Sequence, residues 1–289
     1  MIRLVGIFVG LGFTLVVTLA FLFGFYAWAT EPAAPTAEHE FHLDVKHVDF
    51  SFDGPFPSWD LAQLQRGYKV YKEVCSACHS LDQVAFRNLE ELGYSEGQVK
   101  AEAATWTVPG INPDTGEATG VPGTPTDTFP SPYPNSVAAA AANNNAIPPD
   151  LSLMTKARHH GSAYVYSLLT GYADANTYAN EDGERLMEEF PDFTVPPTGH
   201  FNPYFANLNL AMAPPLTSAG QVTFDDGTEA TVPQMAKDVS AFLTWTAEPS
   251  LVERKRIGWS VIGFLLFATI LAWMAKKQIW AQVKPRRED

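Results

Sequence analysis

Two long apolar stretches frame the chain, and a mixed polar region separates them. Residues 4–29 are almost wholly apolar, and residues 257–275 form a second, uninterrupted apolar segment. At about 1.5 Å per residue, the second segment makes a helix about 28 Å long, which matches the hydrocarbon thickness of a bilayer. The pattern therefore predicts a transmembrane helix over residues 251–279, followed by a short tail at residues 280–289.

The first apolar stretch has the features of an export signal. Arg3 precedes it, and the small-x-small triplet Ala27-Trp28-Ala29 closes it in a form that suits signal peptidase. The stretch is longer than the usual signal core of roughly 7 to 15 residues, so its retention as a second membrane anchor stays open. We expect residues 1–29 to be a signal peptide that is cleaved after Ala29.

The distribution of charge along the chain differs between the polar region and the apolar ends, and it predicts how the protein is oriented in the membrane. Residues 30–250 carry 10 Lys and Arg against 29 Asp and Glu, whereas the two ends together carry 9 against 3. Because the larger basic cluster follows the second apolar segment, the tail should be cytoplasmic and residues 30–250 should lie outside. The acidic balance also disfavours nucleic acid as a partner. The flanking bases are Arg254, Lys255, Arg256, Lys276, Lys277, Lys284, Arg286 and Arg287, and the tryptophans near the segment's ends are Trp259, Trp273 and Trp280.

The polar region between the apolar stretches has the composition of a folded domain. The chain has 289 residues, of which 46% are hydrophobic, so disorder as the overall description is excluded. Two helices are predicted from a capping residue followed by a stripe at helical spacing. The first has Asp60 as cap, Gln63 three residues on, and the stripe Leu61, Leu64, Tyr68 and Tyr71. The second begins with Thr231 and Gln234 as a capping box, followed by the stripe Met235, Val239, Phe242 and Leu243.

Two local features modify this picture. Gly67 lies inside the first predicted helix, where it costs about 1 kcal/mol in helix propensity, so a close crossing with another helix is a plausible compensation. Residues 108–134 contain seven prolines and four glycines. We expect this segment to be an exposed loop without packed elements.

Both cysteines of the chain fall in one motif, Cys75-Ser76-Ala77-Cys78-His79. Two thiols one helical turn apart can each add to a haem vinyl group, and the imidazole that follows can bind the iron. A dithiol redox pair does not require His79, and a zinc site would need further ligands at recognisable spacing. We therefore expect one haem c, covalently bound through Cys75 and Cys78.

Met212 differs from the other candidates for the sixth iron ligand in its surroundings. It precedes Pro214 and Pro215, which fix φ and remove two backbone donors, so a stiff loop can hold its thioether at little ordering cost. A methionine opposite a histidine raises the haem potential, which suits a late electron acceptor. Most of the other candidates fit core or surface positions; they are Met154, Met187, Met235, His39, His42, His47, His159, His160 and His200.

A long ordered series of short motifs runs through nearly the whole chain after the predicted signal. It comprises residues 66–71 before the haem motif, then 142–144, 148–152, 157–159, 164–172, 211–215, 225–228, 236–239 and 247–249. Through this series the chain resembles the cytochrome c1 family, the haem subunits of ubiquinol:cytochrome c oxidoreductase (bc1) complexes, in an alphaproteobacterial form. The resemblance implies a mainly α cytochrome c-type haem domain with long irregular loops and one C-terminal transmembrane helix.

The resemblance also implies a set of haem-binding residues. Cys75 and Cys78 would form the thioether attachments, and His79 and Met212 would be the axial ligands of the iron. Arg158 and Tyr164 would lie near the haem propionates, where an arginine can pair with a carboxylate and a phenol can donate to it. Pro148 and Pro149 would lie against the haem.

The function implied is electron transfer without bond chemistry at this haem. The electron would come from the Rieske iron-sulfur protein and pass to a soluble or membrane-bound cytochrome c, with cytochrome b as a further partner within a dimeric complex. The haem domain would lie on the periplasmic side of the bacterial inner membrane. The residues leave two alternatives open: a free-standing, membrane-tethered c-type cytochrome that shuttles electrons, and a haem enzyme such as a peroxidase with an open iron site.

Overall fold

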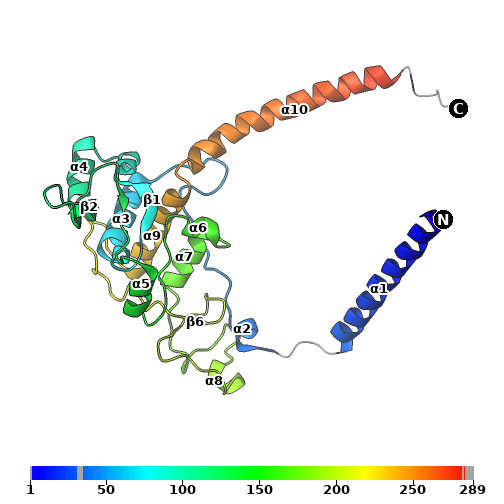
Figure 1. The fold of residues 1–289 in the computed structure, drawn as a ribbon, viewed down its shortest axis with the longest axis horizontal. Coiled ribbons are helices and arrows are strands. Elements are labelled where there is room, and N and C mark those ends of the chain that lie inside the picture. Colours follow the sequence, from blue (N-terminus) through cyan, green and yellow to red (C-terminus); the bar gives the residue numbers. More distant parts are fainter. Residues whose placement is uncertain (1, 31–34, 282, 284–289) are drawn as a thin grey trace. The chain divides into compact units, whose positions relative to one another are not determined.

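The fold is mainly helical, as expected. The computed structural model describes residues 2–30, 35–281 and 283. The chain divides into two compact units: one consists of Met1–His42 with Asn176–Phe193, and the other of Leu43–Ala175 with Thr194–Asp289. The α-helices are α1 (Ile2–Thr30), α2 (Ala37–Glu40), α3 (Leu61–Glu73), α4 (Glu96–Ala104), α5 (Ser136–Ala142), α6 (Met154–Ala157), α7 (Gly161–Leu169), α8 (Leu186–Glu189), α9 (Val232–Ala247) and α10 (Leu251–Ala281) (Figure 1).

Short strand pairs and two 3-10 turns complete the described elements. Each strand pair is antiparallel: β1 (Leu81–Ala85) with β4 (Thr128–Phe129), β2 (Thr107–Ile111) with β3 (Ala118–Pro122), and β5 (His200–Phe201) with β6 (Asn209–Leu210). The 3-10 turns are η1 (Cys75–Ala77) and η2 (Phe86–Leu92). Irregular chain connects most of these elements, which matches the expectation of long loops.

Helices α3 and α9 pack against each other at the centre of the larger unit. Both N-caps are confirmed, because the Asp60 carboxylate accepts the Gln63 N–H at 3.0 Å and the Thr231 hydroxyl accepts the Gln234 N–H at 3.2 Å. The reciprocal half of the Thr231–Gln234 capping box does not form, since the Thr231 N–H donates to Glu229 and the Gln234 side chain bonds Asp238. The predicted stripes are buried except for Leu61, which remains 43% exposed in the first turn of α3. The buried members are Leu64, Tyr68, Tyr71, Met235, Val239, Phe242 and Leu243.

Gly67 lies at the point where α3 crosses α9. A Cβ atom at this position would overlap the carbonyl oxygen of Asp238 and would lie 2.7 Å from the Cβ of Phe242. The obstacle is backbone, which cannot rotate away as a flexible side chain can. The close helix crossing that Gly67 predicts is therefore confirmed.

The substitution Gly67→Ala is expected to lower the free energy of unfolding by about 1 to 3 kcal/mol, because the added methyl group overpacks the crossing. The measurement is urea unfolding of the detergent-solubilised protein. Gly97→Ala in α4 is the matched control, since nothing lies within 4 Å of its added Cβ, and it should stabilise by up to about 1 kcal/mol through helix propensity. Equal stability of the two variants would refute the close crossing.

Residues 108–134 do not form the unpacked loop that their composition predicts. Strands β2 and β3 form a hairpin in which Val108 pairs with Val121, and Val108 is buried. Phe129 is fully buried, with its ring centroid 4.4 Å from that of Phe86 and 5.2 Å from that of Trp106. The expectation is wrong because a two-stranded ribbon has outward positions that need no ladder hydrogen bond, where proline is tolerated.

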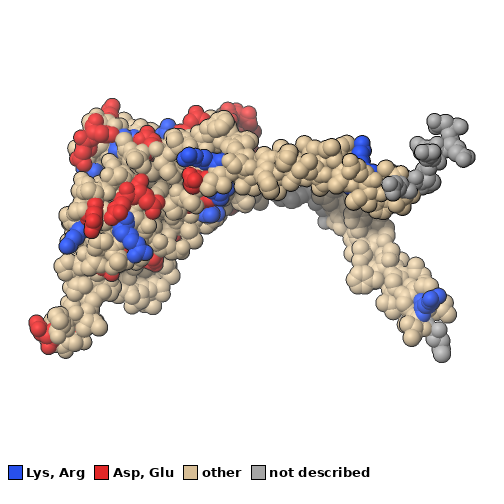
Figure 2. Space-filling model, turned by 90° about the horizontal axis from the view of Figure 1, so that it is seen from above, with Lys and Arg blue, Asp and Glu red and all other residues tan. Residues whose placement is uncertain are grey.

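Helices α1 and α10 are both long and apolar enough to cross a membrane. Figure 2 shows the apolar middle of α10 without charged side chains, whereas acidic and basic side chains gather on the folded domain. The charged residues of α10 lie near its two ends; they are Glu253, Arg254, Lys255, Arg256, Lys276 and Lys277. The described part of α10 covers the predicted segment at residues 257–275. The tail residues Lys284, Arg286 and Arg287, on which the predicted orientation partly depends, lie outside the described residues.

Candidate haem site

The haem motif begins immediately after α3 ends. Residues 75–77 form the single 3-10 turn η1, and the N–H groups of Cys78 and His79 both donate to the Cys75 carbonyl, at 3.1 and 2.9 Å. Both cysteine side chains are half-buried, and Cys75 packs against the hydrophobic core. Before haem attachment, burial, and to a smaller extent the neighbouring Cys78, raises the pKa of the Cys75 thiol to about 12.

The His79 side chain is oriented by a backbone carbonyl. Its Nδ1 lies 2.7 Å from the Pro149 oxygen, so the proton belongs on Nδ1 and the lone pair of Nε2 remains for a metal. Burial lowers the pKa of His79, although the Pro149 carbonyl and Asp150 act in the opposite direction. The ring is therefore held as a neutral imidazole, the form that binds iron. Two thiols beside such an imidazole fit a covalently attached haem.

Asp150 ties the segment that supplies the Pro149 carbonyl to the residues directly after the haem motif. One oxygen of the Asp150 carboxylate accepts the Ser80 hydroxyl at 2.9 Å and the Asp82 N–H at 2.7 Å. The other accepts the Ser152 N–H at 2.9 Å, an Asx-type turn. The sequence analysis did not select Asp150. The local sequence that could have indicated it is an aspartate that directly follows Pro148 and Pro149 and lies two residues before Ser152, a pattern typical of an Asx turn.

The substitution Asp150→Ala is expected to reduce the free energy of unfolding by about 2 kcal/mol, because partly buried donors lose a charged acceptor. It should also loosen the orientation of the His79 ring. Unfolding measurements check the first effect, and the reduction potential of the purified protein checks the second. Asp82→Ala is the control, because the Asp82 side chain is exposed and the residue contributes its backbone N–H to the network. Equal effects of the two substitutions would contradict this role for Asp150.

Met212 lies on a loop that is held in place by hydrogen bonds from side chains to the loop backbone. The residue is half-buried against the hydrophobic core, and the Tyr172 hydroxyl donates to its carbonyl oxygen at 3.0 Å. Burial raises the pKa of Tyr172, so the phenol stays a donor. Further along, the Gln221 amide donates to the Pro215 carbonyl at 2.7 Å and accepts the Thr217 N–H at 2.9 Å. The two prolines are therefore not the loop's only support, and neither Tyr172 nor Gln221 was selected from the sequence.

The structure brings Arg158 and Tyr164 together but places them differently with respect to solvent. Arg158 is exposed, and its guanidinium donates to the Ala157 carbonyl at 3.2 Å and interacts with the Tyr164 hydroxyl. Tyr164 is half-buried; burial raises its pKa, and Arg158 acts in the opposite direction. The pair offers a cation and a phenol at one position, which suits a carboxylate ligand. Of the two prolines, Pro148 is half-buried and Pro149 is exposed.

The fold and the site define a class of protein: a mainly helical c-type cytochrome with an apolar C-terminal anchor helix. The sequence model of the Cytochrome C1 family matches residues 50–283. The chain belongs to this family, so the resemblance seen in the motifs is confirmed.

Relatives with curated names agree with this assignment. The chain is 44% identical over 248 residues to "Cytochrome c1" of Rhodospirillum rubrum, an alignment that covers 84% of this chain and 89% of the relative. It is 42% identical over 258 residues to "Cytochrome c1, heme protein, mitochondrial" of Saccharomyces cerevisiae, covering 89% and 78%. It is 45% identical over 240 residues to "Cytochrome b/c1" of Bradyrhizobium diazoefficiens, covering 80% of this chain but only 35% of that longer protein.

Family membership and the motif together establish the cofactor and the attachment to the membrane. The protein carries one haem c, bound covalently through Cys75 and Cys78. Helix α10 anchors it in the membrane.

Proposed function

We propose that this protein is the electron-transfer subunit of a bc1-type quinol:cytochrome c oxidoreductase. The observation that carries the proposal is the His79 imidazole, held by the Pro149 carbonyl with Nε2 unused, beside two thiols in a chain of this family. Haem c, when bound, supplies a one-electron redox centre. No bond chemistry of a substrate is assigned to this subunit.

Each residue of the site has a distinct part in holding the cofactor. Cys75 and Cys78 would attach it, His79 and Met212 would ligate its iron, and Arg158 with Tyr164 would pair with the propionates. Pro148 and Pro149 would pack against the porphyrin, and the Pro149 carbonyl keeps the His79 proton on Nδ1. A histidine and methionine ligand pair favours a relatively high potential. A relatively high reduction potential suits a redox centre that accepts electrons late in an electron-transfer chain.

The electron donor is the Rieske iron-sulfur protein and the acceptor is a cytochrome c, soluble or membrane-bound. The surplus of acidic residues between positions 30 and 250 supports a basic acceptor, because opposite charge raises association rates while keeping the complex short-lived. Cytochrome b is the partner within the membrane, in a dimeric complex. The haem domain is on the periplasmic side of the bacterial inner membrane, and residues 1–29 are removed as a signal peptide.

Mild-detergent extraction and capture through a C-terminal tag test this function. The expected result is copurification of a b-type cytochrome and an iron-sulfur subunit, together with quinol-dependent reduction of cytochrome c. Recovery of the chain alone would favour a free-standing electron shuttle. Carbon monoxide binding by the reduced protein at neutral pH would indicate an open iron site, and hence a haem enzyme.

A further inference from the structure

Residues 51–58, which we call the aromatic loop, project a phenyl ring into solvent beside the start of α10. The loop is closed by backbone hydrogen bonds from Asp53 to Phe50 at 3.0 Å and from Ser58 to Ser51 at 2.9 Å. At its base Phe52 packs between Phe50 and Trp59, with ring centroids 4.9 and 5.0 Å away. Phe56, at the tip, is 86% exposed. The exposed ring therefore stands on a well-packed base.

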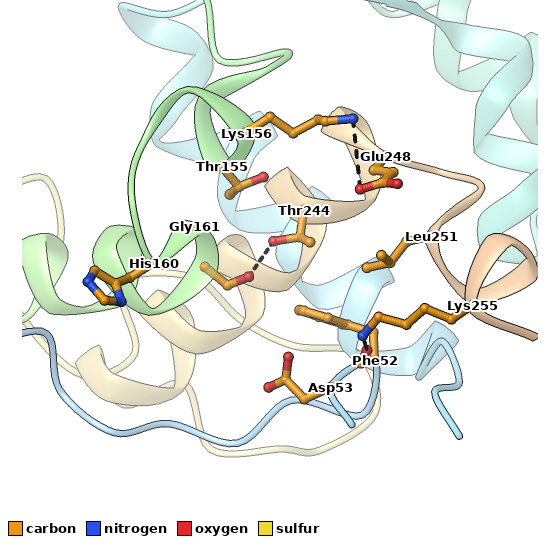
Figure 3. Close-up of a pocket in the computed structure, with 11 residues that line it drawn as sticks. Phe52, Asp53, Thr155, Lys156, His160, Gly161, Thr244, Glu248, Leu251 and Lys255 are labelled. Atoms are coloured by element: carbon orange, nitrogen blue, oxygen red, sulfur yellow. Dashed lines mark hydrogen bonds and ion pairs between the residues drawn. The ribbon is translucent and has the colours of Figure 1, made fainter. Parts of the chain in front are cut away.

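Two side chains of α10 hold the loop against the helix. The Lys255 ammonium donates to the carbonyl oxygens of Phe52 at 3.0 Å and Gly54 at 3.4 Å, and the Trp259 indole N–H donates to the Pro55 carbonyl at 2.8 Å. The Phe56 ring stacks on the Trp259 ring at 6.1 Å. Figure 3 shows Lys255 reaching across to Phe52, at the edge of a cavity of about 190 Å³ beneath the start of α10.

The position of Trp259 sets the depth of the loop relative to the membrane. Trp259 lies two residues inside the apolar segment that begins at Ile257, and it is 51% exposed. Tryptophans at the ends of membrane helices lie at the boundary between headgroups and acyl chains. Because Phe56 stacks on this indole, its ring lies at the same level.

The polar groups of the loop tip are largely satisfied within the protein, as a segment entering this boundary requires. Pro55 and Pro57 have no N–H to satisfy, and the carbonyls of Phe52, Gly54 and Pro55 all accept from α10. The one acid in the loop, Asp53, turns back to accept the Phe50 N–H at 3.0 Å. What the tip presents outward is chiefly hydrocarbon.

We propose that the aromatic loop is a second, interfacial membrane contact, in which Phe56 inserts into the lipid boundary beside α10. Lipid is the occupant that the surroundings favour, since the ring continues the apolar surface of an anchor helix. Arg254, Lys255 and Arg256 directly precede this apolar surface on α10, and Lys255 itself holds the loop. The loop would thereby hold the haem domain at a defined tilt to the membrane, which a single helix alone does not fix.

Spin-label accessibility tests this contact on the full haem-carrying chain in vesicles of phosphatidylethanolamine and phosphatidylglycerol. The two native cysteines are committed to haem, so Phe56→Cys provides one free thiol for a nitroxide. Ile111→Cys is the control, a 68% exposed apolar residue at the end of β2. We expect the ratio of oxygen to nickel-chelate collision rates to be several-fold higher at position 56 than at position 111. Equal ratios would overturn the proposal, and protection of position 56 from both reagents would identify a protein occupant instead and also overturn it.

A second measurement tests whether α10 holds the loop. Trp259→Phe keeps an aromatic ring but removes the indole donor to Pro55, so the label at position 56 should become more mobile. Trp273→Phe, farther along the same helix, should leave the label's mobility unchanged. Equal mobility in both variants would show that the indole does not position the loop.

Discussion

Replacing Met212 with leucine is expected to abolish the near-infrared band that arises from sulfur-to-iron charge transfer. Leucine keeps the apolar volume but offers no lone pair to the iron, so the ligand is lost while the loop contacts from Tyr172 and Gln221 remain. The reduction potential should fall by a few tenths of a volt, within the range of about 0.8 V over which axial ligands tune haem. Optical spectroscopy and a redox titration of the purified protein measure both effects.

The matched control for this substitution is Met154→Leu. Met154 is also a half-buried methionine that packs against the hydrophobic core, so the same change in side chain is made without touching the predicted ligand. The band and the potential should both be retained in this control. Persistence of the band in Met212→Leu, or its loss in Met154→Leu, would show that the ligand assignment is wrong.

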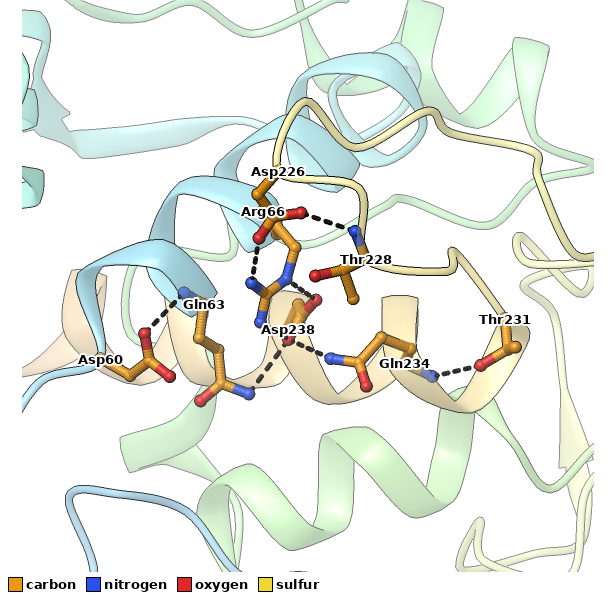
Figure 4. Close-up of polar contacts among 8 residues, drawn as sticks. All are labelled: Asp60, Gln63, Arg66, Asp226, Thr228, Thr231, Gln234 and Asp238. Atoms are coloured by element: carbon orange, nitrogen blue, oxygen red, sulfur yellow. Dashed lines mark hydrogen bonds and ion pairs between the residues drawn. The ribbon is translucent and has the colours of Figure 1, made fainter.

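Replacing Arg66 with methionine is expected to lower the free energy of unfolding by about 3 to 5 kcal/mol, because it leaves the buried Asp238 carboxylate without its cationic partner. Asp238 on α9 is fully buried and accepts the Arg66 Nε–H at 2.8 Å, with amide donors from Gln63 at 3.0 Å and Gln234 at 2.8 Å (Figure 4). Arg66 also binds Asp226 at 2.6 Å. The Thr228 N–H and Arg66 together hold the pKa of Asp226 at about 2.

Two further variants separate the buried charge from other effects of losing a cation. Lys69→Met removes a cation from the same helix whose partner, Asp225, is 88% exposed, and such exposed pairs contribute at most about 1 kcal/mol. Adding Asp238→Asn to Arg66→Met removes the stranded charge and should recover part of the lost stability. Denaturant unfolding measures all of these variants. A loss in Arg66→Met no larger than that in Lys69→Met would contradict the role of the buried pair.

Features that depend on a few neighbouring residues were predicted well from the sequence. The caps at Asp60 and Thr231 and the spacing of the haem motif each involve residues within one or two turns of each other. The length of the apolar segment at residues 257–275 likewise needs no knowledge of the rest of the fold. Leu61 is the exception among the stripe residues, since its exposure depends on where the neighbouring elements end.

Apart from the helix crossing at Gly67, features that depend on how distant segments meet were not predicted. Proline and glycine content wrongly predicted an exposed loop at residues 108–134, because it could not show that strands β2 and β3 pair or that Phe129 reaches the aromatic core. The hydrogen bonds of Asp150 to Ser80, just after the haem motif, and of Tyr172 to Met212 join residues that are far apart in the sequence. A single aspartate or a single tyrosine in the sequence does not indicate that its side chain supports a distant haem-binding segment.

The sequence by itself determined the covalent haem attachment, the anchor helix, the capped helices and the family, because spacing, hydrophobic length and ordered motifs are properties of the chain alone. Only the tertiary structure decided which carbonyl orients His79, which side chains hold the Met212 loop in place, and which carboxylate Arg66 neutralises. It also decided that the aromatic loop rests on α10. These contacts form when packing brings remote backbone and side-chain groups within hydrogen-bond distance, and the linear order of residues does not encode that proximity in any local pattern.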